Sequence, residues 1–184
     1  MDAPQPAVFT IGHSTRTLEE LIAILHRYQI ARLADVRTVP RSARNPQFNH
    51  DTLPAALAAA GIAYEHFPEL GGFRRPRPDS PNDGWRNDSF RGFADYMLTD
   101  EFRAGLAKLL AAARLARTAV MCAEAVPWRC HRSLIADALT AQGVPVEDIF
   151  DAGHSRRHPL TPFARVRGGE VTYPDPALPD APSS

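Results

Sequence analysis

Cysteine is scarce in this chain, lysine is almost absent, and no long apolar run occurs. Two cysteines among 184 residues are too few for a disulfide framework, so we expect a reducing, cytoplasmic environment. No apolar stretch approaches the roughly 20 residues that a membrane span needs. The N-terminus also lacks the basic flank and apolar stretch of a secretory signal. We therefore expect a cytoplasmic protein without a membrane partner.

Net charge is absent as well, because 21 basic residues balance 21 acidic ones. A zero balance argues against a protein whose task is to coat nucleic acid. Lys108 is the only lysine, and the other basic residues are arginines, whose planar forks suit carboxylates and phosphates. At 44% hydrophobic and 23% charged, the composition is that of an ordinary globular domain with a real core.

Short apolar runs alternate with helical patterns along the chain. Strands are expected over residues 7–11, 31–36, 62–67, 119–122 and 144–150. Helices are expected after Thr15 or Thr17, over 51–60, over 90–116 with a break at Thr99-Asp100, and from Ser133, which we predict to be an N-cap. This alternation predicts the α/β class, with a single domain over residues 1–167 whose mainly parallel sheet carries helices on both faces.

Two segments lie outside this pattern. Residues 74–89 have no periodicity and many helix breakers, and we expect a long surface loop that is either a lid over the site or disordered. Residues 168–184 are rich in Pro, Asp and Ser, which predicts a disordered tail.

Polar side chains follow the apolar part of nearly every expected strand. Because the carboxyl ends of parallel strands share one edge of a sheet, these side chains should converge there, where α/β proteins bind ligands. The set consists of His13, Asp35, Arg37, His66, Glu69, Cys122, Glu124 and His154. The densest group of reactive side chains lies on the strand-to-helix loop that follows Cys122 and contains Glu124, Arg129, Cys130, His131 and Arg132.

Several short motifs carry a family resemblance. They are Thr10-Ile-Gly-His-Ser14, Asp35-Val-Arg37 with Pro40-Arg-Ser42, Phe48-Asn49, Gly61-Ile62 with Tyr64, Leu70-Gly-Gly72, and Cys122-x-Glu124 leading to Cys130-His-Arg132. In this combination the chain resembles a bacterial and archaeal family, the domain of unknown function 488, from about residue 8 to residue 160. The resemblance implies a compact α/β domain but no particular reaction. The Arg/Pro-rich insertion after Gly72 and the Pro-rich tail depart from the family pattern.

The first functional hypothesis is an enzyme that acts on a phosphate-bearing or nucleotide-like anionic substrate. Cys122 would be the nucleophile or a polar contact, Glu124 or Asp35 the general base, and His13 the proton shuttle. An anion-binding set would consist of Arg37, Arg41, Arg132 and Ser14, with the free N–H groups at the start of the helix after Arg132. The Cys-x5-Arg spacing of cysteine phosphatases is absent, because Arg129 lies seven residues and Arg132 ten residues after Cys122.

Other hypotheses remain open. Cys122, Cys130 and His131 could bind zinc with His13, His66 or His154, although their spacing is not that of a standard zinc knuckle. A binding module for nucleotides or nucleic acid could use the loop arginines together with Phe48, Phe73, Trp85 and Trp128. In the purely structural interpretation, Cys122 is a small buried hydrophobe and Glu124 pairs with Arg132. His50 and His158 are expected to be surface or capping residues. No dinucleotide or Walker motif is present, so we expect no organic cofactor.

Overall fold

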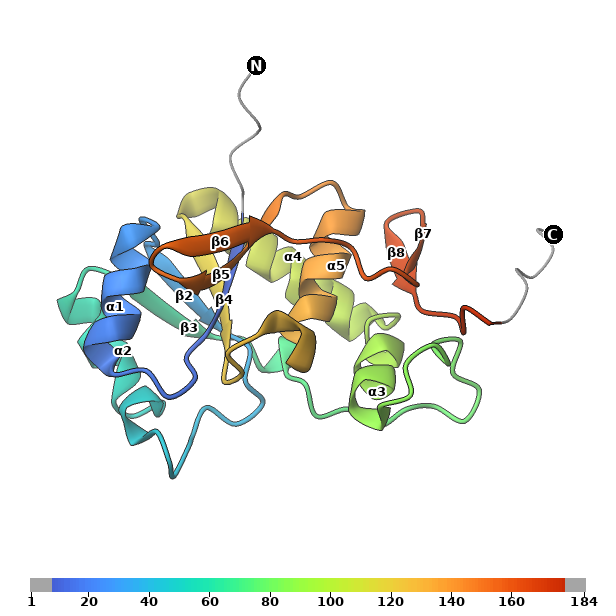
Figure 1. Cartoon of the computed structure of the whole chain (residues 1–184), viewed down its shortest axis with the longest axis horizontal. Helices are drawn as coiled ribbons and strands as arrows, with labels where there is room; N and C mark the ends of the chain where they lie inside the picture. Colours follow the sequence, from blue (N-terminus) through green and yellow to red (C-terminus); the bar gives the residue numbers. More distant parts are fainter. Residues whose placement is uncertain (1–7, 178–184) are drawn as a thin grey trace, which may run out of the picture.

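In the computed structural model, which describes residues 8–177, a six-stranded sheet forms the centre of the molecule (Figure 1). Its strand order is β3-β2-β4-β1-β5-β6, and every neighbouring pair is parallel except β5 and β6. The strands are β1 (Val8–Gly12), β2 (Arg32–Asp35), β3 (Ala63–His66), β4 (Thr118–Cys122), β5 (Val146–Asp151) and β6 (His154–Arg157). The predicted α/β class with a mainly parallel sheet is confirmed.

Helices cover both faces of the sheet, as the sequence predicts. Helices α1 (Leu18–Arg27) and α2 (Leu53–Ala59) bury Leu21, Leu25 and Leu57 on one face. On the other face lie α3 (Asp88–Tyr96), α4 (Asp100–Leu115) and α5 (Arg132–Ala141). Strand residues alternate between the two cores, since Met121 packs with the first group of helices and Val120 with the second. No helix within residues 8–177 has both the length and the apolarity that a membrane span requires.

The ends of the helices agree with the predicted signals in all but one case. Thr17 caps α1 by accepting a hydrogen bond from the Glu20 N–H, and Thr99 caps α4 at the predicted break. Gly143 follows α5 with φ of 78°, a conformation that glycine adopts without strain. The prediction for Ser133 is wrong. Helix α5 begins at Arg132, and the Ser133 hydroxyl donates to the Cys130 carbonyl at 2.9 Å.

The prediction of a disordered tail is wrong for residues 168–177. Strands β7 (Arg165–Arg167) and β8 (Glu170–Thr172) form a hairpin, and Tyr173 behind it is fully buried. Val171 and Tyr173 are two residues apart and therefore reach the core from the same side of an extended chain. Two buried residues are too short a pattern to predict a strand in a segment whose composition is otherwise polar. Residues 178–184 lie outside the described part of the chain.

The long loop predicted over residues 74–89 is irregular as far as Asn87, where it caps α3. It is an anchored loop rather than a disordered one, because the buried Asp95 carboxylate accepts hydrogen bonds from the Arg77 N–H, the Ser80 hydroxyl and the Asn82 amide. The Asn82 side chain in turn accepts from the Tyr173 N–H at 2.8 Å. The loop is thereby tied to both α3 and the C-terminal segment.

Candidate active site

The carboxyl ends of β1, β2 and β4 bring the predicted site residues together. In the parallel register, Gly12 lies beside Cys122 and Asp35 lies beside Met121. The residues that follow these strand ends therefore leave the sheet at one edge. The convergence predicted from strand polarity is confirmed for this part of the sheet.

A pocket of ≈ 450 Å³ opens at this edge. Of the predicted site residues, it is lined by His13, Arg37, Arg41, Cys122 and Glu124. Its other lining residues are Thr38, Val39, Ser42, Gly72, Phe73, Asn87, Ser89, Phe90, Ala123, Arg129, Cys130 and His131. The wall thus combines three arginines and two thiols with exposed apolar side chains at the rim, of which Phe73 is 81% and Val39 59% exposed.

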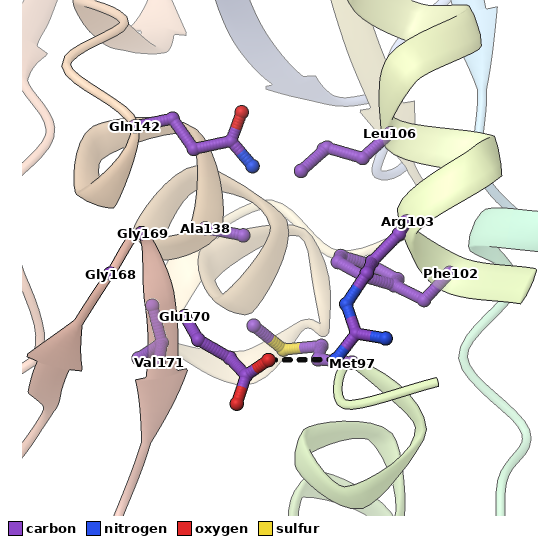
Figure 2. A pocket seen from close by; sticks show the side chains of 10 residues that line it. All are labelled: Met97, Phe102, Arg103, Leu106, Ala138, Gln142, Gly168, Gly169, Glu170 and Val171. Carbon is purple, nitrogen blue, oxygen red and sulfur yellow. Dashed lines mark hydrogen bonds and ion pairs between the residues drawn. The ribbon is translucent and has the colours of Figure 1, made fainter. Parts of the chain in front are cut away.

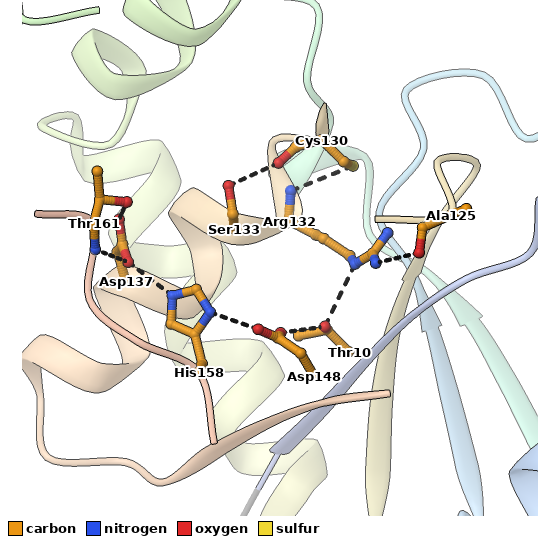
Figure 3. A network of polar contacts seen from close by, with 9 residues as sticks. All are labelled: Thr10, Ala125, Cys130, Arg132, Ser133, Asp137, Asp148, His158 and Thr161. Atoms are coloured by element: carbon orange, nitrogen blue, oxygen red, sulfur yellow. Dashed lines mark hydrogen bonds and ion pairs between the residues drawn. The ribbon is translucent and has the colours of Figure 1, made fainter. Parts of the chain in front are cut away.

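Arg132 holds the Cys122 sulfur from inside the protein. Its guanidinium is completely buried, and Nη1 donates to Cys122 Sγ at 2.8 Å and to the Glu124 carbonyl. The Nη2 group donates to the Ala125 carbonyl at 3.3 Å (Figure 3). Arg132 is absent from the pocket wall and its donors meet protein atoms, so its predicted contact with a substrate stays a prediction. Within the protein, Arg132 positions the thiol.

The predicted anion cradle at the start of α5 is occupied by the protein itself. The Arg132 N–H donates to Cys130 Sγ at 3.4 Å, and the Ser133 N–H donates to the Cys130 carbonyl. The N–H groups of Leu134 and Ile135 donate to the His131 carbonyl. The amino end of this helix therefore directs its positive pole at the sulfur of Cys130 rather than at the open pocket.

The pKa values of the two thiols are shifted in opposite directions. Burial acts to raise the pKa of Cys122, but a hydrogen bond from Cys130 and the charge and hydrogen bond of Arg132 outweigh it and lower this pKa to about 7. Burial and the neighbouring Cys122 raise the pKa of Cys130 well above its usual value. The lowered pKa favours the thiolate form of Cys122 near neutral pH, whereas the raised pKa keeps Cys130 in the thiol form.

Gly12 in β1 permits this arrangement, because a Cβ atom there would overlap the Glu124 carbonyl and lie 2.9 Å from Arg132 Nη1. We predict that Gly12→Ala will displace the loop after Cys122, destabilise the protein by about 1–3 kcal/mol and slow alkylation of Cys122. Thermal unfolding and iodoacetamide labelling measure the two effects. Gly153→Ala is the control, since its new Cβ would meet only Asp151 Oδ1, at 3.6 Å. Unchanged alkylation in Gly12→Ala would show that the close approach is not needed.

Asp35 supports Arg37 and does not face the pocket. Its buried carboxylate accepts from Arg37 Nε at 2.9 Å and Nη2 at 2.7 Å, and from the Tyr64 hydroxyl at 2.6 Å. Burial and the Asp35 carboxylate raise the pKa of Tyr64, which therefore stays protonated as the donor. Both carboxylate oxygens of Asp35 are thus occupied by protein donors, and its role as a general base, the alternative to Glu124, stays a prediction.

His13 lies in the pocket wall beside Arg37. Its ring stacks on Phe48 with the centroids 4.5 Å apart, and Nδ1 contacts the Ser14 carbonyl at 2.8 Å. Because a carbonyl can only accept, Nδ1 carries the hydrogen, and Nε2 presents its lone pair at 3.4 Å from Arg37 Nη1. Burial lowers the pKa of His13, which favours this neutral form. Nε2 is the nitrogen through which this neutral imidazole would take up a proton, in competition with the Arg37 contact and against the lowered pKa.

The remaining predicted residues have mixed positions. Glu124 and Arg41 are exposed in the pocket wall, whereas Ser14 is outside it and holds the loop through its N–H bond to the Ala123 carbonyl. His66 contacts the Arg37 carbonyl at 2.7 Å, also outside the pocket wall. Two further residues that were expected at this edge of the sheet lie outside the pocket wall. Glu69 pairs with Lys108, and His154 pairs with Asp151.

A buried polar network behind Arg132 was not predicted (Figure 3). Arg132 Nε donates to the Thr10 hydroxyl at 3.4 Å, and Thr10 donates to Asp148 at 2.6 Å. His158 bridges Asp148 at 2.9 Å and Asp137 at 2.8 Å. The expectation that His158 is a surface or capping residue is wrong, because it is only 7% exposed. Its partners come from β5 and α5, so only the folded chain reveals the group.

Two other observations bear on binding sites. A smaller pocket of ≈ 190 Å³ lies between α4, α5 and β8, where Arg103 pairs with Glu170 at 2.7 Å (Figure 2). It contains none of the predicted site residues. Across residues 8–177, no three His, Cys, Asp or Glu side chains are grouped to hold a metal ion. His131, a proposed zinc ligand, instead uses Nε2 for the Val36 carbonyl at 2.9 Å.

Comparison with known proteins identifies a family. The family model described as domain of unknown function DUF488 matches residues 17–139. This range includes the Asp35-Arg37 pair and the whole loop from Cys122 to Arg132. No curated protein and no solved structure matches the chain.

Proposed function

The chain belongs to the DUF488 family, and we propose that this protein is a cysteine-dependent enzyme acting on a small anionic substrate that carries phosphate or resembles a nucleotide. The observation that carries the proposal is the 2.8 Å contact between Arg132 Nη1 and Cys122 Sγ at the wall of an arginine-lined pocket. A buried cation beside a sulfur favours the nucleophilic thiolate. A purely structural cysteine would not need such a partner.

The charge of the pocket supports an anionic substrate. Arg41 and Arg129 are exposed in its wall, and within residues 8–177 neither guanidinium makes a hydrogen bond or an ion pair. Such guanidinium groups can bind phosphate or carboxylate through two hydrogen bonds at once. Phe73 and Phe90 supply apolar surface beside them, which suits a flat ring attached to the anion.

The reaction would proceed through a covalent intermediate on Cys122. The thiolate attacks the electrophilic atom of the substrate, and the leaving group departs with the bonding electrons. Water then cleaves the new bond to sulfur, donates its proton to Nε2 of His13 and regenerates the thiolate. His13 passes that proton to the departed group, so that the cycle consumes substrate and water alone.

A ligand screen tests the substrate class. Thermal unfolding would be followed with inorganic phosphate, nucleosides, nucleoside monophosphates and short oligonucleotides. A ligand at about 100 times its Kd adds roughly 2.7 kcal/mol, or about 5–10 °C for a domain of this size. We expect a small phosphorylated ligand to give this shift. Arg41→Gln and Arg129→Gln should each weaken its binding about 10- to 100-fold, the value of one charge-assisted contact.

Arg27→Gln is the matched control. Arg27 is exposed at the carboxyl end of α1 and does not line the pocket. Cys122→Ser separates binding from turnover, since it should keep the shift and lose product formation. A shift with oligonucleotides alone would favour a binding module, for which the exposed Phe73 offers a stacking surface. No shift with any of these ligands would contradict the proposed substrate class.

A further inference from the structure

We infer that Cys122 and Cys130 form an oxidation site, in which a hydroperoxide oxidises Cys122 and Cys130 then closes a disulfide with it. The inference shares one premise with the proposed function, the reactive thiolate of Cys122. It adds a second reaction of the same pocket and assigns a role to Cys130, which takes no part in the proposed cycle.

The geometry brings the two sulfurs to one place. Cys122 ends β4 and Cys130 precedes α5, and both are free thiols. Arg132 contacts both of them, Cys122 Sγ through Nη1 at 2.8 Å and Cys130 Sγ through its main-chain N–H at 3.4 Å. Both residues also line the wall of the same pocket. The two thiols therefore lie in one part of the pocket wall, on either side of Arg132.

The two cysteines are nearly buried but can be reached through the pocket. Cys122 is 2% and Cys130 6% exposed, yet both line the open pocket. A hydroperoxide is small enough to enter a pocket of ≈ 450 Å³. Oxidation-sensitive cysteines have thiolate character and access to solvent, and they often lie next to a resolving cysteine. The pair in this pocket meets these conditions.

The chemistry balances with the hydroperoxide as the oxidant. The Cys122 thiolate attacks the outer peroxide oxygen and becomes a sulfenic acid, while the O–O bond breaks and the remaining oxygen leaves with the bonding electrons, takes a proton from solvent and becomes water or an alcohol. Cys130 then attacks the sulfenic sulfur, the S–S bond forms, and the hydroxyl group leaves with the Cys130 proton as water. Two electrons pass from the thiols to the peroxide. A dithiol reductant reverses the result by thiol–disulfide exchange.

The closed disulfide would have two consequences. It removes the nucleophile from the pocket and so suspends the proposed enzymatic activity. It also prevents further oxidation of Cys122 to the sulfinic and sulfonic acids, which a thiol reductant does not reverse. Cys130 thus acts as a resolving residue.

The test uses the reduced full-length protein and hydrogen peroxide. After treatment, intact mass under denaturing conditions should show the loss of two hydrogen atoms, and iodoacetamide should label neither cysteine until dithiothreitol is added. In Cys130→Ser and Cys130→Ala, Cys122 should instead react with dimedone, a sulfenic acid probe, and in samples without dimedone it should gain two or three oxygen atoms. Both variants are used because Cys130 is buried, and thermal unfolding verifies that each is folded.

Each outcome separates the inference from the proposed function. Rapid alkylation of Cys122 in the untreated protein, combined with accumulation of sulfinic acid rather than a disulfide in the wild type, would overturn the role of Cys130 and leave the proposed enzyme intact. A disulfide between two chains on a non-reducing gel would also overturn it. If Cys122 reacts with neither iodoacetamide nor peroxide, the thiolate premise fails and both proposals fail with it.

Discussion

Replacing Arg132 with methionine is expected to suppress the reactivity of Cys122 at neutral pH and to destabilise the fold. Methionine fills part of the same space but offers no charge and no donor to Cys122 Sγ or to the carbonyls of Glu124 and Ala125. The pKa of Cys122, now about 7, should rise towards that of an ordinary buried thiol. The thiolate fraction at pH 7, and with it the alkylation rate, should fall on the order of 10- to 100-fold.

The stability loss follows from the same contacts. Removing a fully buried cation leaves buried acceptors without a donor, at a cost of about 3–5 kcal/mol, or roughly 6–20 °C in the midpoint of thermal unfolding. Arg132→Lys is the matched control, because it keeps the charge and loses the planar fork. We expect it to recover part of the alkylation rate. The rate of iodoacetamide labelling against pH, followed at the Cys122 peptide, measures the effect directly.

One result would reassign the cause. If the Arg132→Met variant folds and the alkylation of its Cys122 still titrates near pH 7, the effect of Cys130 alone is sufficient to lower the pKa of Cys122. The same measurement on Cys130→Ser would then show the large increase in the pKa of Cys122 instead.

Strand polarity made the location of the site predictable. Each parallel strand delivers its next polar residues to the same edge, so the separate segments that contain His13, Arg37 and Cys122 could be brought together without a structure. The observed register of Gly12 beside Cys122 fulfils this expectation. The rule gives only the edge of the sheet, however, and does not give the depth of each side chain.

The sequence could not predict how deeply each of these side chains is buried. Asp35 and Arg132 are charged, and charged side chains near a site suggest contact with a ligand. Asp35 instead pairs with Arg37, and Arg132 donates to the Cys122 sulfur, so both are satisfied inside the protein. Pairing of this kind depends on where the neighbouring strands place their side chains. A linear pattern does not contain that information.

The C-terminal segment shows a second limit. The Asp137 carboxylate binds His158, Thr161 and Tyr173, which come from parts of the chain where the sequence predicted neither a helix nor a strand. Helix α5 buries Asp137 only because these later residues supply its donors. An acidic residue on a buried helical face was the one signal that could have indicated missing partners.

His158 should make stability depend on pH above neutrality. Its two ring nitrogens lie 2.8 Å from Asp137 and 2.9 Å from Asp148, and both carboxylates are buried. Burial alone would lower the pKa of His158, but the hydrogen bonds and charges of the two carboxylates raise it to about 9. The unfolded chain protonates this side chain near pH 6.5. The folded state therefore holds a proton that the unfolded state releases between these values.

The sign of the effect follows from this difference. The stabilisation is fully present below pH 6.5 and is lost as the pH rises through 9, with a total on the order of 3 kcal/mol. Cys122 acts in the opposite direction, because its pKa is lowered on folding and it adds stability above pH 7. The total stability of the wild type would mix the two contributions, so the effect of His158 has to be read as a difference between two proteins that share Cys122.

His158→Gln supplies that difference. Glutamine does not titrate and cannot donate a charge to both carboxylates, so at pH 6 the variant should be about 3–5 kcal/mol less stable than the wild type. Between pH 6.5 and 9.5 this gap should narrow by roughly 3 kcal/mol, as measured by urea unfolding at each pH. His154→Gln is the control, because His154 also pairs with an aspartate, at 2.8 Å, but is 80% exposed. Its cost should stay below about 1 kcal/mol. A gap between wild type and His158→Gln that is constant with pH would mean that His158 is not held as a cation, and that the network behind Arg132 stabilises the fold through neutral hydrogen bonds.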